Sequence, residues 1–146
     1  MSLKPSQNCI NLIKRFEGCR LKAYKCPAAM WTIGYGTTRY PNGKAVMEGE
    51  EISLYRAESL LTYDINKFAS QIKVNVNQNQ FDALICFAYN IGIGAFNGST
   101  LKKMVLANPG DELIRNQFMR WVAKGSPYTK GLTNRRKAEA DLYFKI

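Results

Sequence analysis

The chain contains 146 residues, which is enough for one domain or for two small lobes that share a core, but too few for two independent domains. Its hydrophobic fraction of 46% and charged fraction of 22% are typical of a packed soluble protein and exclude a disordered chain. The net charge of +10 favours polyanionic partners, which leaves nucleic acid, an anionic membrane surface and the acidic polymers of a bacterial envelope as alternatives.

Histidine is absent from the sequence, so Ser-His-Asp and Cys-His catalysis and HExxH-type metal sites are excluded. The four cysteines lack the density of a secreted disulfide scaffold and no two have CxxC spacing, so we expect no zinc at these positions: Cys9, Cys19, Cys26 and Cys86. We therefore predict no metal site and no cofactor. The chemistry must rest on carboxylates, thiols, hydroxyls or lysines.

Membrane insertion is not indicated by the sequence. No apolar run approaches the roughly 20 residues of a membrane helix, because the longest candidate, residues 83–93, contains Tyr89 and Asn90. Residues 1–7 hold one lysine and no apolar segment, so we expect no signal peptide there and no stable membrane insertion.

The N-terminal third of the chain predicts a helix followed by a small sheet. Apolar residues recur at near-helical spacing over residues 6–17, where Ser6 can cap the helix and Gly18 can end it. Residues 21–45 change character, because glycines and prolines there surround β-forming residues between Trp31 and Tyr35. This composition predicts a short sheet with irregular turns.

Two longer helices are expected next. Apolar residues keep a helical stripe for about five turns over residues 53–72, and this helix would join two lobes. Asn77 and Gln80 form a capping-box pattern ahead of the apolar segment 81–88. We predict that this segment is the central helix of the core.

The C-terminal part is predicted to hold three further helices. Glycines at 92, 94 and 98 precede a helix expected over residues 99–107, and residues 109–111 open another. The last helix is expected from Leu132 or Thr133 to Phe144. We expect its apolar residues to face inward and its basic residues to face outward, namely Ala138, Leu142 and Phe144, and Arg135, Arg136 and Lys137.

Taken together, the elements predict an α+β fold, mostly α, in a single domain over residues 1–146. We expect a sheet-containing lobe over about residues 15–55, with a short antiparallel sheet, joined by the long helix to a larger lobe. That helical lobe would cover about residues 75–146 and pack with the N-terminal helix.

Glu17 is the first candidate for chemistry, because it lies where the first helix meets the glycine-rich sheet segment. Such junctions often line a cleft, and a half-desolvated carboxyl there could donate a proton near neutral pH. By residue type alone, an exposed glutamate at a helix end is the commoner interpretation. The assignment therefore depends on the residues that follow Glu17.

The string from Glu17 to Thr38, EGCRLKAYKCPAAMWTIGYGTT, resembles the signature of the phage-type lysozymes, glycoside hydrolase family 24, with its pattern Glu-x8-Asp/Cys-x5-Thr. The resemblance continues through residues 77–84 (NQNQFDAL), 90–92 (NIG), 96–101 (FNGSTL) and 131–139 (GLTNRRKAE). It implies a lysozyme-like fold and an endolysin, a muramidase that hydrolyses the β-1,4 bond between N-acetylmuramic acid and N-acetylglucosamine in bacterial peptidoglycan and so lyses the host cell.

The same resemblance assigns catalytic roles. Glu17 would be the general acid of an inverting hydrolase, and Cys26 and Thr32 would place or activate the attacking water. Lys22 and Lys25 are close in sequence and could favour a Cys26 thiolate. Three alternatives stay open: Cys26 as a small buried residue, Cys26 as the nucleophile of a retaining reaction, and Thr32 as a residue suited to a strand and nothing more.

Substrate contacts follow from the family similarity alone. Thr38, Tyr89 and Thr100 would occupy positions that line the substrate-binding cleft. Other aromatic residues near the motifs, such as Tyr24 and Trp31, are at positions that more often belong to a core than to a platform for sugars.

The sequence departs from the family pattern at two places. Ala29-Met30 stands where glycine followed by a small or aromatic residue is usual, and Thr37 stands where histidine is common. We expect the first change to restrict the turn that holds Cys26, because glycine is the residue that best tolerates unusual backbone angles. The second change is expected to remove a tie between the sheet and another segment.

The resemblance also implies a monomer made in the host bacterial cytoplasm that acts on the cell wall from the periplasm after a separate holin opens the membrane. One alternative is a catalytically inactive peptidoglycan-binding module, against which the intact Glu17 argues. The other is a helical nucleic-acid-binding protein, favoured by the net charge and by residues 135–137. No recognised nucleic-acid motif accompanies those cations, so we expect no nucleic-acid partner.

Overall fold

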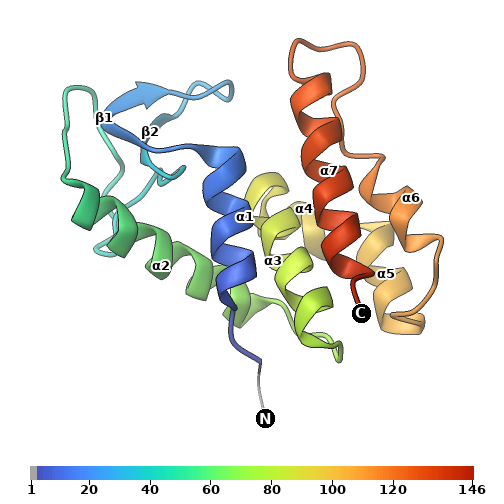
Figure 1. Cartoon of the computed structure of the whole chain (residues 1–146). Coiled ribbons are helices and arrows are strands. Elements are labelled where there is room, and N and C mark those ends of the chain that lie inside the picture. Colours follow the sequence, from blue (N-terminus) through green and yellow to red (C-terminus); the bar gives the residue numbers. More distant parts are fainter. Residues whose placement is uncertain (1–2) are drawn as a thin grey trace. The chain divides into compact units, whose positions relative to one another are not determined.

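The computed structural model describes residues 3–146 and shows seven helices and a two-stranded antiparallel sheet over that range (Figure 1). The predicted α+β, mostly helical fold class is confirmed. The strands are β1 (Arg20–Lys25) and β2 (Trp31–Gly34). The helices are α1 (Gln7–Glu17), α2 (Leu54–Gln71), α3 (Gln78–Ile91), α4 (Ile93–Asn97), α5 (Thr100–Ala107), α6 (Ile114–Phe118) and α7 (Thr129–Tyr143).

The chain divides into two compact units. The sheet unit is Ile13–Lys67, and the helical unit is Phe68–Ile146 together with the described residues up to Leu12. The boundaries fall inside α1 and α2, so each of these helices contributes residues to both units. No helix within residues 3–146 is both long and apolar enough to cross a membrane.

The sheet unit is built on the antiparallel pair of β1 and β2. Tyr24 lies opposite Thr32 in this pair, and the register is irregular between Arg20 and Tyr24. Ile33 of β2 is fully buried and forms a small core cluster with Val46 and Leu60, the last from α2. Alternation along β2 therefore points Ile33 into the core and leaves Thr32 on the other strand face.

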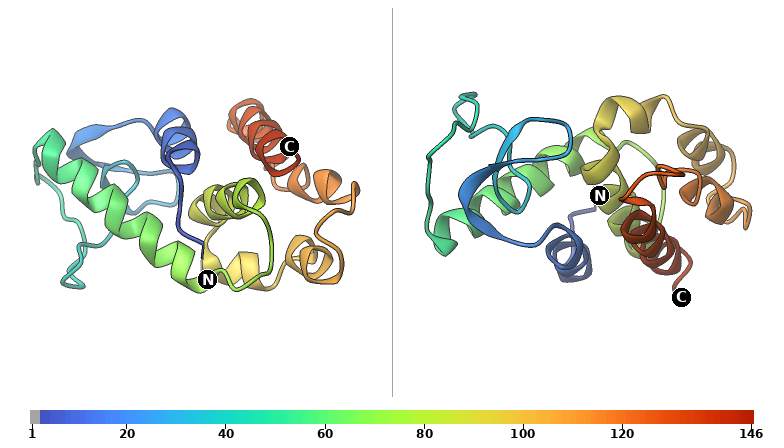
Figure 2. Two further views of the ribbon diagram at one scale, coloured as in Figure 1. Left: turned by 60° about the horizontal axis from the view of Figure 1, so that its bottom comes forward. Right: turned by 90° about the horizontal axis from the view of Figure 1, so that it is seen from above.

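The helical unit is organised around α3, which packs against α4 and α7 (Figure 2). The predicted capping box is confirmed: the Asn77 side chain accepts from the Gln80 N–H, and the Gln80 side chain accepts from the Asn77 N–H. Every residue from 81 to 88 is buried, as a central core helix requires. Phe87 of this segment contacts the rings of Phe96, Phe118 and Trp121 edge-on.

Helix boundaries differ from the sequence prediction in three places. The short helix α4 lies within the glycine-rich stretch, where no helix was predicted. The helix expected after residues 109–111 is reduced to α6, which begins at Ile114. Helix α7 begins at Thr129, three residues before the predicted start at Leu132.

Ser6, which was predicted to cap α1, is hydrogen-bonded to α3. Its backbone N–H and its hydroxyl both donate to the carboxylate of Asp82 in α3. The distance from the Ser6 nitrogen to the Asp82 Oδ1 is 3.0 Å. Asp82 is fully buried, so these bonds satisfy a charge that would otherwise be costly to desolvate. The serine thus fixes the chain before α1 to α3.

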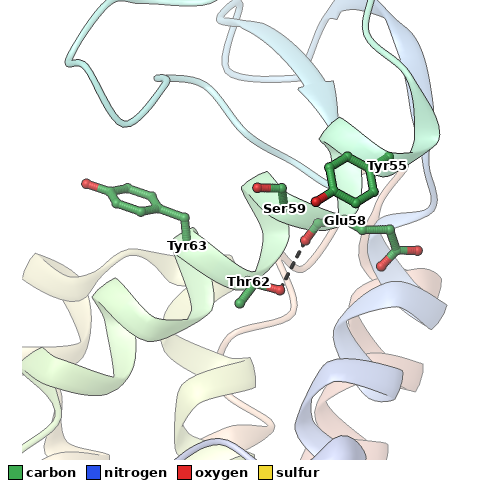
Figure 3. A pocket seen from close by; sticks show the side chains of 5 residues that line it. All are labelled: Tyr55, Glu58, Ser59, Thr62 and Tyr63. Carbon is green, nitrogen blue, oxygen red and sulfur yellow. Dashed lines mark hydrogen bonds between the residues drawn. The ribbon is translucent and has the colours of Figure 1, made fainter.

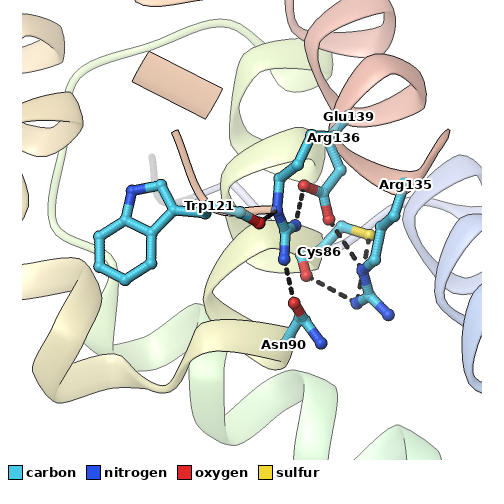
Figure 4. Close-up of polar contacts among 6 residues, drawn as sticks. All are labelled: Cys86, Asn90, Trp121, Arg135, Arg136 and Glu139. Atoms are coloured by element: carbon cyan, nitrogen blue, oxygen red, sulfur yellow. Dashed lines mark hydrogen bonds and ion pairs between the residues drawn. The ribbon is translucent and has the colours of Figure 1, made fainter. Parts of the chain in front are cut away.

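The prediction that Arg135 and Arg136 face outward is wrong, because both are buried in the helical unit (Figure 4). Glu139, one turn further along α7, accepts from the guanidinium groups of both arginines. Arg135 also donates to the C=O of Cys86 at 2.9 Å, and Arg136 to the C=O of Trp121 at 3.0 Å. Two of the three cations that favoured a nucleic-acid surface are therefore interior residues.

Candidate active site

Glu17 is the last residue of α1 and is half-buried. Gly18 follows with a φ of +66°, a backbone angle that suits glycine, and its N–H donates to the C=O of Lys14 at 3.1 Å. This glycine ends α1 and turns the chain into β1. The carboxyl of Glu17 is thereby held at the junction of helix and sheet that the sequence predicted.

Cys26 begins the tight turn between β1 and β2. Its N–H donates to the C=O of Met30 at 2.9 Å, and its C=O accepts from the N–H of Ala29 at 2.8 Å. Ala29 has a φ of +62°, in the left-handed region that disfavours residues with a Cβ atom. The family glycine that this sequence lacks would relieve that strain, so the turn holding Cys26 is strained as expected.

The surroundings of the Cys26 thiol favour its ionised form. Burial opposes ionisation, but hydrogen bonds from the N–H of Met30, the hydroxyl of Thr32 and the N–H of Ala28 outweigh it and lower the pKa of the Cys26 thiol. Lys22 and Lys25, which were expected to favour the thiolate, are not among these leading causes, which come from the turn itself and from Thr32. Burial raises the pKa of Cys9 and Cys86, so those two free thiols differ from Cys26 in this respect.

Thr32 lies in β2 and is 3% exposed. Its hydroxyl donates to the C=O of Met30 at 3.0 Å and also lies within hydrogen-bonding reach of the Cys26 sulfur. A threonine hydroxyl has one proton and two lone pairs. The Thr32 hydroxyl can therefore donate to the Met30 carbonyl when the thiol is neutral, or to the sulfur when Cys26 is ionised.

Tyr24 lies near the candidate catalytic residues, but it was not predicted from the sequence as a site residue. It lies opposite Thr32 across the sheet, and the guanidinium carbon of Arg20 is 4.5 Å from its ring centroid. Burial is the main cause that raises the pKa of the Tyr24 hydroxyl, and the negative charges of Glu17 and Cys26 raise it further. Tyr24 is thus within electrostatic reach of both residues. Its place two residues before Cys26 in an alternating strand is the signal that could have indicated it.

The tie that we expected to be lost at Thr37 is present in another form. The Thr37 hydroxyl donates to a carboxylate oxygen of Asp64 in α2 at 2.7 Å, and Thr37 is 1% exposed. Burial raises the pKa of Asp64, and the hydrogen bond from Thr37 and the charge of Lys67 only partly offset this effect. The expectation that replacing histidine leaves the sheet untied to another segment is therefore wrong.

The three predicted substrate contacts fall in different parts of the chain. Thr38 belongs to the sheet unit, where its C=O accepts from the N–H of Val46, whereas Tyr89 and Thr100 belong to the helical unit. Tyr89 is half-buried at the C-terminal end of α3, with its ring 5.4 Å from that of Phe68. Thr100 begins α5 and helps to line a hollow of about 290 Å³ together with Gly98, Ser99, Gln117, Arg120 and Trp121.

A metal centre is not indicated by the described side chains. Across residues 3–146, acidic and cysteine side chains form no group of three or more that could hold an ion. The site therefore offers a carboxyl, a thiol whose ionised form is stabilised, and a hydroxyl, from Glu17, Cys26 and Thr32. All three come from the sheet unit.

A mostly helical chain with one small antiparallel sheet after its first helix has a lysozyme-like fold, and comparisons with known proteins agree. The family described as phage lysozyme matches residues 14–139. The endolysin of Bacillus phage B103 is 43% identical over 145 residues, which cover 94% of this chain and 53% of that protein. This chain belongs to the phage lysozyme family.

Two solved structures show the same fold. The endolysin from the Escherichia coli O157:H7 phage FAHEc1 is 40% identical, with a TM-score of 0.83 and coverage of 99% of this chain and 96% of that chain. The muramidase domain of SpmX from Asticaccaulis excentricus is 29% identical, with a TM-score of 0.81 and coverage of 98% and 99%. The chain nevertheless spans about half the length of the Bacillus phage relative.

Proposed function

We propose that this chain is a muramidase that hydrolyses the bond between N-acetylmuramic acid and N-acetylglucosamine in bacterial peptidoglycan. Membership of the phage lysozyme family supports the reaction class. The observation that carries the proposal is the pairing, within one compact unit, of Glu17 at a helix end with a Cys26 thiol whose ionisation the β1–β2 turn stabilises.

In this mechanism Glu17 is the general acid and protonates the glycosidic oxygen as its bond to the anomeric carbon breaks. The leaving sugar departs as an alcohol, and positive charge develops on the remaining ring. The Cys26 thiolate opposes that charge and accepts a proton from water as the water attacks from the opposite face. The configuration at the anomeric carbon is inverted, as a single displacement requires.

Thr32 would orient the attacking water. Its hydroxyl already contacts the Met30 carbonyl and the Cys26 sulfur, so a lone pair remains to accept from a water molecule beside the thiolate. Thr38, Tyr89 and Thr100 are proposed to contact the glycan. These roles rest on the family positions of the three residues.

The biological setting follows from the endolysins among the relatives. We propose that the protein is made in the cytoplasm of the host bacterium, acts as a monomer on the wall from the periplasm, and lyses the cell. Passage across the inner membrane would depend on a separate holin. The net charge of +10 would favour adhesion to an anionic envelope.

Digestion of purified peptidoglycan by the parent protein and by Glu17→Gln tests the proposal, with product ends identified by mass spectrometry after borohydride reduction. We expect reduced muramic acid ends from the parent and a rate lower by about 10²- to 10⁴-fold for Glu17→Gln, the usual contribution of a general acid. Glu48→Gln, an exposed glutamate of the same unit, is the matched control. Anhydromuramic ends would identify a transglycosylase instead, and no products from the parent would reject the enzyme.

A further inference from the structure

A hollow of about 410 Å³ lies on α2 in the sheet unit and is lined by Tyr55, Glu58, Ser59, Thr62 and Tyr63 (Figure 3). These positions recur at three- and four-residue intervals, so they share one face of the helix. The buried residues of α2 lie on a different face: Ala57, Leu60, Leu61 and Ile65. The hollow is therefore a surface feature of α2, and none of the proposed catalytic residues lines it.

Two exposed tyrosines flank this hollow. Tyr55 is 85% exposed and Tyr63 is 43% exposed. Figure 3 shows their rings on either side of Ser59 and Thr62. Tyr63 follows Tyr55 by eight positions in the helix, which corresponds to about 12 Å along the axis. This span suits a ligand of roughly two linked sugar rings, each able to lie against one aromatic ring.

The charge of the lining indicates a neutral ligand. No lysine or arginine lines the hollow, although the chain has 21 of these residues. The one acidic group, Glu58, accepts from Lys14 at 2.7 Å and from the Tyr35 hydroxyl at 3.2 Å, so its charge is already paired. What remains is four hydroxyls and two aromatic faces, which match the hydroxyls and the C–H faces of a sugar chain. The Thr62 hydroxyl donates to the C=O of Glu58 at 3.1 Å, so it can only accept from a sugar hydroxyl.

We propose that this face of α2 is an accessory site that binds the uncharged sugar backbone of a peptidoglycan strand away from the bond being cleaved. Tyr55 and Tyr63 would stack on pyranose rings, and Ser59 and Thr62 would contact sugar hydroxyls between them. The proposal rests on the proposed muramidase function and deepens it by naming a second contact with the same substrate. Such a site would raise the affinity for the polymer more than for short fragments, because only a long strand can reach both sites.

The first test compares a Tyr55→Ala/Tyr63→Ala double variant with its parent, both in a Glu17→Gln background so that the polymer is not consumed. Co-sedimentation with purified sacculi should weaken by roughly two- to tenfold for each ring removed. Tyr128→Ala is the matched control, since Tyr128 is 53% exposed and belongs to the helical unit. Ser59→Arg, which fills the hollow without removing a ring, should weaken binding as well.

The second test uses proteins with Glu17 intact and measures the ratio of the rates on sacculi and on short soluble glycan fragments. The double variant should lower this ratio, while the Tyr128→Ala control keeps it. Equal sedimentation of the double variant and its parent would overturn the accessory site. Loss of a wild-type dimer in the double variant, detected by sedimentation velocity, would overturn it too and make this face a protein interface. Hydrolysis of short fragments by the parent reports on the proposed function separately from either result.

Discussion

Thr37 donates its hydroxyl proton to Asp64 over 2.7 Å and so fixes the segment after β2 to α2. Because Thr37 is almost fully buried, Thr37→Val removes the donor without changing the side-chain volume much and leaves the Asp64 carboxylate short of a partner. We expect a loss of about 1–3 kcal/mol in the free energy of unfolding. Urea denaturation measures this loss, and Thr37→Ser, which keeps the hydroxyl, should retain most of the stability. Equal stability of the valine and serine variants would contradict the role of the bond.

Asp64 should make stability depend on pH in the opposite sense to an ordinary ion-paired carboxylate. Its pKa is raised in the folded protein, chiefly by burial, so the folded state binds the proton more tightly than the unfolded state. The contribution of Asp64 is therefore most favourable below the unfolded pKa of about 3.9 and is lost as the pH rises through the folded pKa. We expect Asp64→Asn to be at least as stable as the parent at pH 7, with this advantage vanishing near pH 4. Thermal melts across that range, with Asp141→Asn as an exposed control, would show it.

Ala29→Gly should stabilise the protein, although most substitutions by glycine destabilise. Ala29 has a φ of +62°, so removal of its Cβ relieves strain worth roughly 1 kcal/mol. Ala28→Gly is the matched control, because the neighbouring alanine lacks a positive φ and should lose about 0.5–1 kcal/mol through backbone entropy. Guanidinium denaturation of the parent and both variants measures these changes in the free energy of unfolding. A loss of stability in Ala29→Gly similar to that in Ala28→Gly would refute the strain.

Cys26→Ser should reduce glycan hydrolysis by about 10²-fold or more, because the serine hydroxyl does not ionise in the accessible pH range. The lowered pKa of Cys26 predicts that the acid limb of the parent's pH–rate profile lies below the usual thiol value of about 8.5. Cys26→Asp should retain activity and move that limb to lower pH, since a carboxylate ionises more readily. Full activity of Cys26→Ser with an unchanged profile would exclude an essential thiolate.

Glu139→Gln should be among the most destabilising single substitutions in the helical unit. The change leaves the buried guanidinium groups of Arg135 and Arg136 without their counter-charge, which typically costs about 3–5 kcal/mol. Lys137→Gln on the exposed face of α7 should change stability by less than about 0.5 kcal/mol. Chemical denaturation distinguishes the two outcomes. A small effect of Glu139→Gln would mean that the arginines find other partners.

Features with a local physical cause could be predicted from the sequence. The capping box of α3 follows from Asn77 and Gln80, since both of its hydrogen bonds lie within one helical turn. Strain in the turn after Cys26 could also be anticipated, because the family places glycine where this chain has Ala29. The position of Glu17 at a helix end followed from Gly18 in the same way.

Features that depend on distant partners could not be predicted. Charged residues such as Arg136 are expected outside, and its burial depends on the carbonyl of Trp121, fifteen residues earlier, as well as on Glu139. The bond from Thr37 to Asp64 spans 27 residues, so no local pattern indicates it. Neighbouring lysines were expected to lower the pKa of the Cys26 thiol, whereas its leading causes are hydrogen bonds from backbone N–H groups of its turn and from the Thr32 hydroxyl.

The proposed catalytic groups are encoded in one continuous stretch, residues 17–32, in which a helix end, two strands and a turn fix their spacing. Inserting or deleting a single residue there would rotate a strand face or open the turn, and so would misalign all three groups at once. Loops outside the stretch carry no such constraint, because lengthening a surface loop costs little. We therefore expect insertions and deletions among family members to accumulate outside residues 17–32. The spacing of the three catalytic groups would then stay constant across the family.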